Sequence, residues 1–110
     1  MFLTGCASSH VSVQSAHCVL NGASLSSSIT NHSDKPLTQI EVVADFYNNY
    51  RFTRGIGGMS FSPVLDPGQT RTVNIPVDVP NGAQGEAMKC SVTRAVYGDD
   101  SVEGESLRRQ

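Results

Sequence analysis

Apolar and polar side chains alternate between Leu37 and Asn48 with the period of two residues that is typical of a β-strand. One face of this strand carries apolar residues: Ile40, Val42, Ala44 and Phe46. The opposite face is half polar: Glu41, Val43, Asp45 and Tyr47. The turn-forming run Asn31–Pro36 precedes the strand and separates it from an earlier apolar-alternating run that ends near Thr30. This pattern predicts a strand in a sheet with one buried face and one face in water.

Further short strands are predicted on both sides of this one. An Asn21-Gly22 hairpin signal separates Cys18–Leu20 from Ser24–Thr30. Two more runs, Thr70–Val79 and Ala87–Tyr97, carry apolar residues at alternate positions: Val73, Ile75, Val77, Cys90, Val92 and Val96. The glycine run Gly55–Gly58 matches no phosphate-binding spacing, and we expect it to be a flexible connection between two sheets. Without any helix-length amphipathic segment, these strands predict an all-β sandwich.

Composition limits the possible partners. The 110 residues predict one domain with a modest core, and the net charge of −2 with only eight Lys and Arg gives no basic surface for nucleic acid. No apolar run reaches the roughly 18 residues of a membrane span. We therefore expect no nucleic-acid partner and no cofactor.

The N-terminus suggests a different link to a membrane. Leu3-Thr4-Gly5-Cys6 resembles the lipobox that ends a bacterial lipoprotein signal peptide, in which the cysteine thiol receives the lipid. Only five residues precede Cys6, fewer than the roughly 7–15 of a full apolar signal core, so we expect the true start to lie upstream or the sequence to be shortened. The alternative is a chance match. The expected organisation is a signal remnant and tether at residues 1–12, a β-domain at 13–98, and a mobile acidic-polar tail at 99–110.

Two cysteines remain, Cys18 and Cys90, each on an apolar β-run. In an oxidising envelope they predict a disulfide, which would close a loop of 72 positions and contribute roughly 4 kcal/mol in the chain-entropy model. In a cytosolic protein they would instead be two buried free thiols.

A family resemblance covers Val19 to Tyr97. The stretch Asn31-His32-Ser33-Asp34-Lys35-Pro36-Leu37, the strand that follows it and the turn Leu65-Asp66-Pro67-Gly68 resemble the FxLYD-type immunoglobulin-like module. Ala44 stands where that pattern has an aromatic residue, and Asn48 where it has Asp. The resemblance implies an immunoglobulin-like β-sandwich of about seven short strands, acting as a non-catalytic extracytoplasmic module.

The sequence offers little catalytic or metal-binding chemistry. His10, His17 and His32 have no metal-ligating partner at a suitable spacing, and the acidic residues after Gly98 do not have the spacing of an EF-hand. No serine elbow or Ser-His-Asp set can be assembled. Asn31-His32-Ser33 matches a glycosylation sequon but is better interpreted as a turn. The sequence therefore predicts neither an enzyme nor a metal site.

Two functions remain. The first is an envelope lipoprotein, anchored through Cys6 to the outer membrane and facing the periplasm, whose domain is a structural module or binds an envelope protein. Tyr47, Tyr50 and Phe52 would form its interaction surface if exposed, although we expect a β-corner packed on its own sheet. The second is a periplasmic carrier of a small molecule, sugar or metal, which would require an apolar pocket with convergent polar groups.

Overall fold

The computed structural model describes residues 11–48, 51–78 and 85–105, and every regular element in them is a β-strand. The strands are β1 (Val13–Asn21), β2 (Ser24–Asn31), β3 (Leu37–Asn48), β4 (Arg51–Leu65), β5 (Thr70–Asp78), β6 (Gly85–Glu86), β7 (Lys89–Tyr97) and β8 (Val102–Gly104). The all-β prediction is confirmed. None of the described residues belongs to a helix of the length and apolar character that crossing a bilayer requires.

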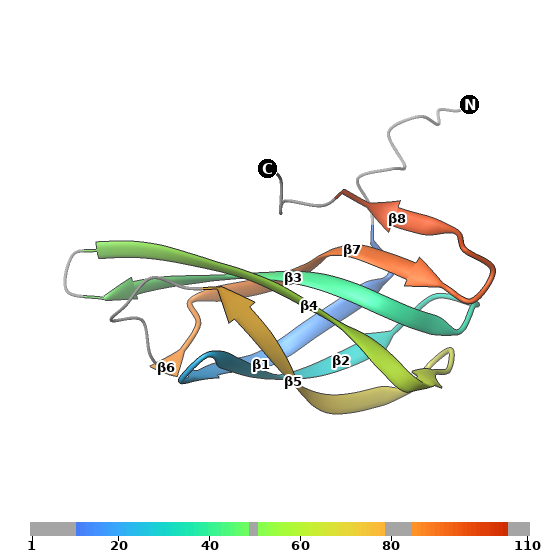
Figure 1. The fold of residues 1–110 in the computed structure, drawn as a ribbon, viewed down its shortest axis with the longest axis horizontal. Coiled ribbons are helices and arrows are strands. Elements are labelled where there is room, and N and C mark those ends of the chain that lie inside the picture. Colours follow the sequence, from blue (N-terminus) through green and yellow to red (C-terminus); the bar gives the residue numbers. More distant parts are fainter. Residues whose placement is uncertain (1–10, 49–50, 79–84, 106–110) are drawn as a thin grey trace.

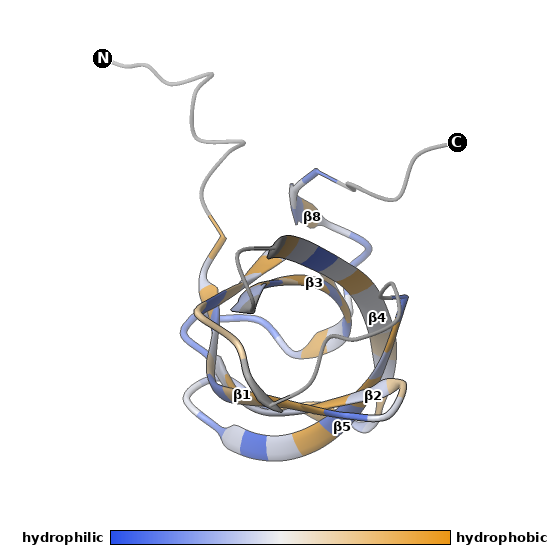
Figure 2. Ribbon diagram, turned by 90° about the vertical axis from the view of Figure 1, so that its left-hand side faces the viewer, coloured by the Kyte–Doolittle hydropathy of each residue, from blue (hydrophilic) through white to orange (hydrophobic). Residues whose placement is uncertain are grey.

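The strands form one antiparallel sheet in the order β6-β1-β2-β5-β4-β3-β7-β8 (Figure 1). Viewed along its length, the sheet curls round so that β1 and β2 lie across from β3 (Figure 2). A two-layer sandwich is not confirmed, because β5 joins what would be the two layers. It pairs with β2 along most of its length and then with β4, where Val77 lies opposite Gly57. The result resembles a half-barrel.

The glycine run is part of a strand and does not connect two sheets. Gly55–Gly58 lies inside β4, paired with β3 on one side and meeting the end of β5 on the other. A Cβ atom on Gly57 would collide with the Pro76 carbonyl oxygen and with Val77. The expectation of a flexible connection was therefore wrong, because these glycines allow two backbones to approach closely.

The inner face of β3 is as predicted, and its outer face is not. Ile40, Val42, Ala44 and Phe46 are buried in the core of the curled sheet. On the opposite face, however, Glu41, Val43 and Asp45 are also buried, whereas Tyr47 is exposed. β3 lies between β4 and β7, so side chains from both neighbours cover its outer face.

The Asn31 side chain organises the turn between β2 and β3. It is fully buried, and its amide donates to the carbonyl oxygens of Lys35 (2.8 Å) and Leu65 (3.0 Å). Its Oδ1 accepts hydrogen bonds from the Ser33 backbone N–H and hydroxyl. The interpretation of the sequon as a turn is consistent with this geometry, because the side-chain amide is committed to the fold.

The final strands depart from simple alternation. β7 has a bulge where it passes Glu41 and Val42, so its buried positions shift from Val92 to Ala95 and Tyr97, whereas Val96 is only half-buried.

The segment predicted as a mobile tail contributes β8, whose residues Val102–Gly104 pair with β7. The Glu103 carboxylate links β8 to the rest of the domain, because it accepts hydrogen bonds from the Tyr97 hydroxyl (2.7 Å) and the Ser12 backbone N–H (2.9 Å).

Candidate functional site

Two aromatic side chains stand in solvent at the tip of the β3–β4 hairpin. Tyr47 and Phe52 lie directly opposite each other in the register, and they are 57% and 55% exposed. The expectation that they would pack on their own sheet was wrong. Tyr50, the third residue of the predicted interaction surface, lies outside the described residues. We call Tyr47 and Phe52 the aromatic tip.

An ion pair joins β3 and β4 two residues away from the aromatic tip. Asp45 is buried, and it accepts hydrogen bonds from Arg54 Nε (2.8 Å) and Nη2 (3.3 Å). The hydrogen bond to Asp45 raises the pKa of the Arg54 guanidinium. The same guanidinium carbon lies 5.9 Å from the centre of the Phe52 ring, within range of a cation–π contact. Arg54 therefore lies beside the Phe52 ring, while Phe52 remains more than half exposed.

One more exposed apolar side chain lies near the aromatic tip. Met88 is 66% exposed, and its backbone N–H donates to the Asp45 carbonyl oxygen (2.8 Å). Tyrosine and phenylalanine combined with methionine are typical of the centres of protein-binding surfaces. This end of the molecule therefore presents the side chains that a protein partner would cover.

The aromatic tip lies far from the start of the described chain. The molecule measures 45 × 32 × 24 Å along its principal axes. In Figure 1 the β3–β4 hairpin ends at the left of the long axis, whereas the chain enters β1 from the right-hand half. An attachment that precedes β1 would leave the aromatic tip pointing away from it.

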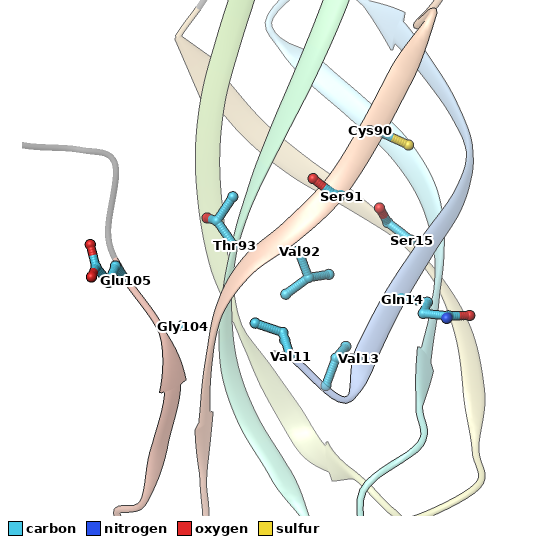
Figure 3. Close-up of a pocket in the computed structure, with 10 residues that line it drawn as sticks. All are labelled: Val11, Val13, Gln14, Ser15, Cys90, Ser91, Val92, Thr93, Gly104 and Glu105. Carbon is cyan, nitrogen blue, oxygen red and sulfur yellow. The ribbon is translucent and has the colours of Figure 1, made fainter. Parts of the chain in front are cut away.

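A groove of about 760 Å³ separates β1 from β7 at the open side of the sheet. Figure 3 shows that Val11, Val13 and Val92 point into it from the two sides. The remaining lining is mostly hydroxyl-bearing or small: Gln14, Ser15, Cys90, Ser91, Thr93, Gly104 and Glu105. Sequence reasoning missed this groove, because its two sides lie about 75 positions apart and no local motif links them.

The predicted cysteine pair ties the two sides of the groove together. Cys18 of β1 and Cys90 of β7 are joined as a disulfide in the structure, with their Cα atoms 6.5 Å apart. Cys18 is buried and Cys90 is half-buried. Across the described residues no backbone ladder links β1 to β7, so the disulfide is the covalent link at this seam.

The other predicted residues do not assemble into a reactive site. Cys6 and His10 lie outside the described residues, and His17 and His32 are exposed. Asp99 accepts hydrogen bonds from the Ser101 hydroxyl and backbone N–H and pairs with Lys35 at 3.2 Å. These contacts lower the pKa of Asp99 to about 2. Throughout the described segments no group of three or more His, Cys, Asp or Glu side chains is placed to hold a metal ion.

Comparisons with protein-family models, with curated proteins and with solved structures found no match.

Proposed function

We propose that this protein is a non-catalytic bacterial envelope lipoprotein whose β-domain binds another protein through its aromatic tip. The observation that carries the proposal is the exposure of Tyr47 and Phe52 as a cross-strand pair. Exposed aromatic side chains are enriched among the residues that dominate protein–protein binding energies. Arg54, stacked near Phe52, adds a side chain type that is enriched at the same places.

The proposed anchor is Cys6, within the Leu3-Thr4-Gly5-Cys6 lipobox match. Each buried CH₂ of an acyl chain contributes about 0.8 kcal/mol, so two or more chains hold a small domain stably on a bilayer. The separation of the aromatic tip from the start of β1 supports this arrangement, because a domain tethered before Val11 can present its tip away from the membrane. Ala7, in place of Asp after the cysteine, favours the outer membrane by the same resemblance.

We also propose that the domain is a variant of the FxLYD-type immunoglobulin-like module. Two motifs that carry the resemblance meet in the fold, since the Asn31 amide donates to the Leu65 carbonyl oxygen. The backbone N–H of Gly68 in turn donates to the Asn31 carbonyl oxygen (2.7 Å). Within the single curled sheet, the consecutive strands β6-β1-β2-β5 and β4-β3-β7-β8 correspond to the two layers that such a sandwich would have.

The carrier function has less support. A small-molecule site normally surrounds most of its ligand with apolar walls. The groove between β1 and β7 lies at the open side of the sheet, and its lining mixes three valines with three hydroxyl-bearing residues, Gln14 and Glu105. An open groove of this kind does not enclose a small molecule.

The test of anchoring compares the chain, expressed with its upstream sequence, with its Cys6→Ser variant in cells given labelled palmitate. The anchored protein should carry label and sediment with membranes, whereas the variant should do neither while keeping the same circular dichroism spectrum. Unlabelled, freely soluble wild-type protein would contradict the proposed anchor.

The test of binding compares complex sizes after mild detergent extraction. A Tyr47→Ser, Phe52→Ser double variant should run as the isolated protein, whereas the wild type should run as a larger complex. The matched control is Val19→Ser, Val64→Ser, which removes two other exposed apolar side chains and should leave the complex intact. Equal complex sizes in the wild type and the tip variant would refute the binding proposal.

A further inference from the structure

We propose that the aromatic tip recognises an acidic segment of its protein partner, in which carboxylates flank an apolar side chain. An acidic partner rests on the proposed function, because the binding surface is the same and only the chemistry of the partner is added. Three features point to it: exposed cations beside the tip, a guanidinium held in place, and a separation of charge along the molecule.

Two cations lie in the row of the sheet next to the aromatic tip. Asp45 of β3 lies opposite Arg54 of β4 on one side and opposite Lys89 of β7 on the other. Directly paired residues share a face of a sheet, so both cations lie on the outer face that carries Tyr47 and Phe52. Neighbouring strands are about 4.8 Å apart, which places the backbones of the two cations roughly 10 Å from each other.

The charge that this row presents to solvent is positive. Asp45 is buried, and Arg54 already pairs with its carboxylate. Lys89 is exposed and forms no ion pair with any of the described residues. The stretch Tyr47–Arg54 contains no Asp or Glu, and the exposed Asp78 meets β4 two positions beyond Arg54. A protein that covers the tip therefore meets two cations, which carboxylates would compensate.

Arg54 is already positioned to bind a second carboxylate. Arginine has five N–H donors, and Asp45 accepts hydrogen bonds only from Nε and Nη2, while the Arg54 side chain remains 49% exposed. The cation–π contact with Phe52 restrains the same guanidinium. A guanidinium restrained in this way loses little conformational freedom when a partner binds, which favours affinity.

The opposite end of the molecule carries the opposite charge. Exposed aspartates lie in the β2–β3, β4–β5 and β7–β8 turns, at the right of the long axis in Figure 1: Asp34, Asp66, Asp99 and Asp100. Lys35, in the first of these turns, pairs with Asp99. An acidic partner would be attracted to the tip and repelled by the far end, which orients the encounter.

The surface fits a protein better than other anionic partners. Two exposed cations are fewer than the roughly four to eight Lys and Arg of typical binding sites for anionic lipids. They are also fewer than the roughly six to ten phosphate contacts of a typical nucleic-acid interface. Tyr47, Phe52 and Met88 add exposed apolar surface, which phosphate groups do not cover. An acidic protein segment with an apolar residue supplies both kinds of contact.

The first experiment compares complexes of the full chain after mild detergent extraction. Lys89→Glu should weaken the complex at least about tenfold, measured by its dissociation on dilution, because a like charge would then face the partner's carboxylates. Lys89→Arg should keep it. The matched control is Lys35→Glu, which makes the same change in net charge at the opposite end and should leave the complex intact. Raising NaCl from about 50 to about 500 mM should weaken the wild-type complex, because salt screens exposed charges.

The second experiment identifies the partner's groups with a zero-length carbodiimide, which joins an amine to a carboxylate in contact with it. Mass spectrometry of the crosslinked wild-type complex should find Lys89 joined to Asp or Glu of a different protein. The Lys89→Arg complex should form but lack this product, because a guanidinium is not coupled.

The outcomes separate this partner from the proposed function. If no complex depends on the tip, both are wrong. If a complex depends on the tip but is unchanged by Lys89→Glu and by salt, the acidic partner alone is wrong. A complex dispersed by nuclease, or Lys89-dependent sedimentation of the Cys6→Ser chain with protein-free anionic vesicles, would also refute it. A Lys89 crosslink to an aspartate of a second copy would identify head-to-tail copies as the occupant and refute it too.

Discussion

Opening the Cys18–Cys90 disulfide should cost the domain a large share of its stability. The bond joins residues 72 positions apart, and the chain-entropy model gives about 4 kcal/mol for a loop of that length. Single domains are stable by about 5–15 kcal/mol in total. No backbone ladder supports the same seam among the described residues.

The assay is urea unfolding of oxidised and reduced wild-type protein, followed by far-UV circular dichroism. With a slope near 2 kcal/mol per molar urea, a loss of about 4 kcal/mol moves the midpoint down by about 2 M. Extrapolated free energies of unfolding are compared as well, because the crosslink reduces the surface exposed on unfolding and thus the slope.

A double variant, Cys18→Ala with Cys90→Ala, separates the crosslink from packing. The Ser27 hydroxyl lies 3.3 Å from the Cys18 sulfur and also donates a hydrogen bond to the Ala16 carbonyl oxygen (3.2 Å). It therefore keeps one hydrogen-bond partner when the sulfur is removed. The variant should therefore match the reduced wild type within about 1 kcal/mol. Equal stabilities of the oxidised and reduced proteins, or two reactive thiols in denatured but unreduced protein, would refute this reasoning.

Three further predictions concern the turns and the crossing of β4 with β5. Asn31→Ala should destabilise the domain by about 2–4 kcal/mol, measured by urea unfolding, because buried carbonyl oxygens lose their donor; Asn74→Ala, on an exposed side chain, should have little effect. Gly57→Ala should cost about 1–3 kcal/mol by forcing β5 away from β4, whereas Gly98→Ala, where a Cβ meets only ordinary contacts, should stay within about 0.5 kcal/mol in thermal unfolding. Because the folded state lowers the pKa of Asp99 from 3.8 to about 2, its contribution is present above pH 4 and lost as the pH falls towards 2. Acid titration should therefore show the stability difference between wild type and Asp99→Asn disappearing over that interval, and a difference that persists at pH 2 would contradict it.

The sequence predicted the features that depend on local periodicity and turn chemistry. The inner face of β3 and the Asn21-Gly22 hairpin follow from alternation and from a residue pair that favours tight turns, and the structure contains both. The disulfide prediction required only two cysteines on apolar strands and an assumption about compartment.

The remaining features depend on contacts between distant residues. Asp45 looks like a solvent-facing residue in the sequence, yet Arg54 pairs with it and neighbouring strands cover it. Gly57 looks flexible, but the crossing of β5 requires it to lack a side chain. Because the β7 bulge reverses inward and outward positions after Val92, no uniform period could place Ala95 and Tyr97 correctly.

In the candidate site, too, the residue types could be identified from the sequence, whereas their surroundings could not. Tyr47 and Phe52 were identified by residue type, but their exposure depends on the hairpin extending beyond its neighbours, which alternation does not reveal. The groove could not be predicted at all, since it exists only where a curled sheet brings β1 near β7.

Binding of an envelope protein by the aromatic tip can be measured in cells by site-specific photocrosslinking. A photoreactive amino acid replaces Tyr47 in one strain and Thr72, an exposed residue of β5, in another. We expect a discrete crosslinked product from position 47 that disappears when Phe52→Ser is added, and none from position 72. The same products from both positions, or a position-47 product that survives Phe52→Ser, would contradict it.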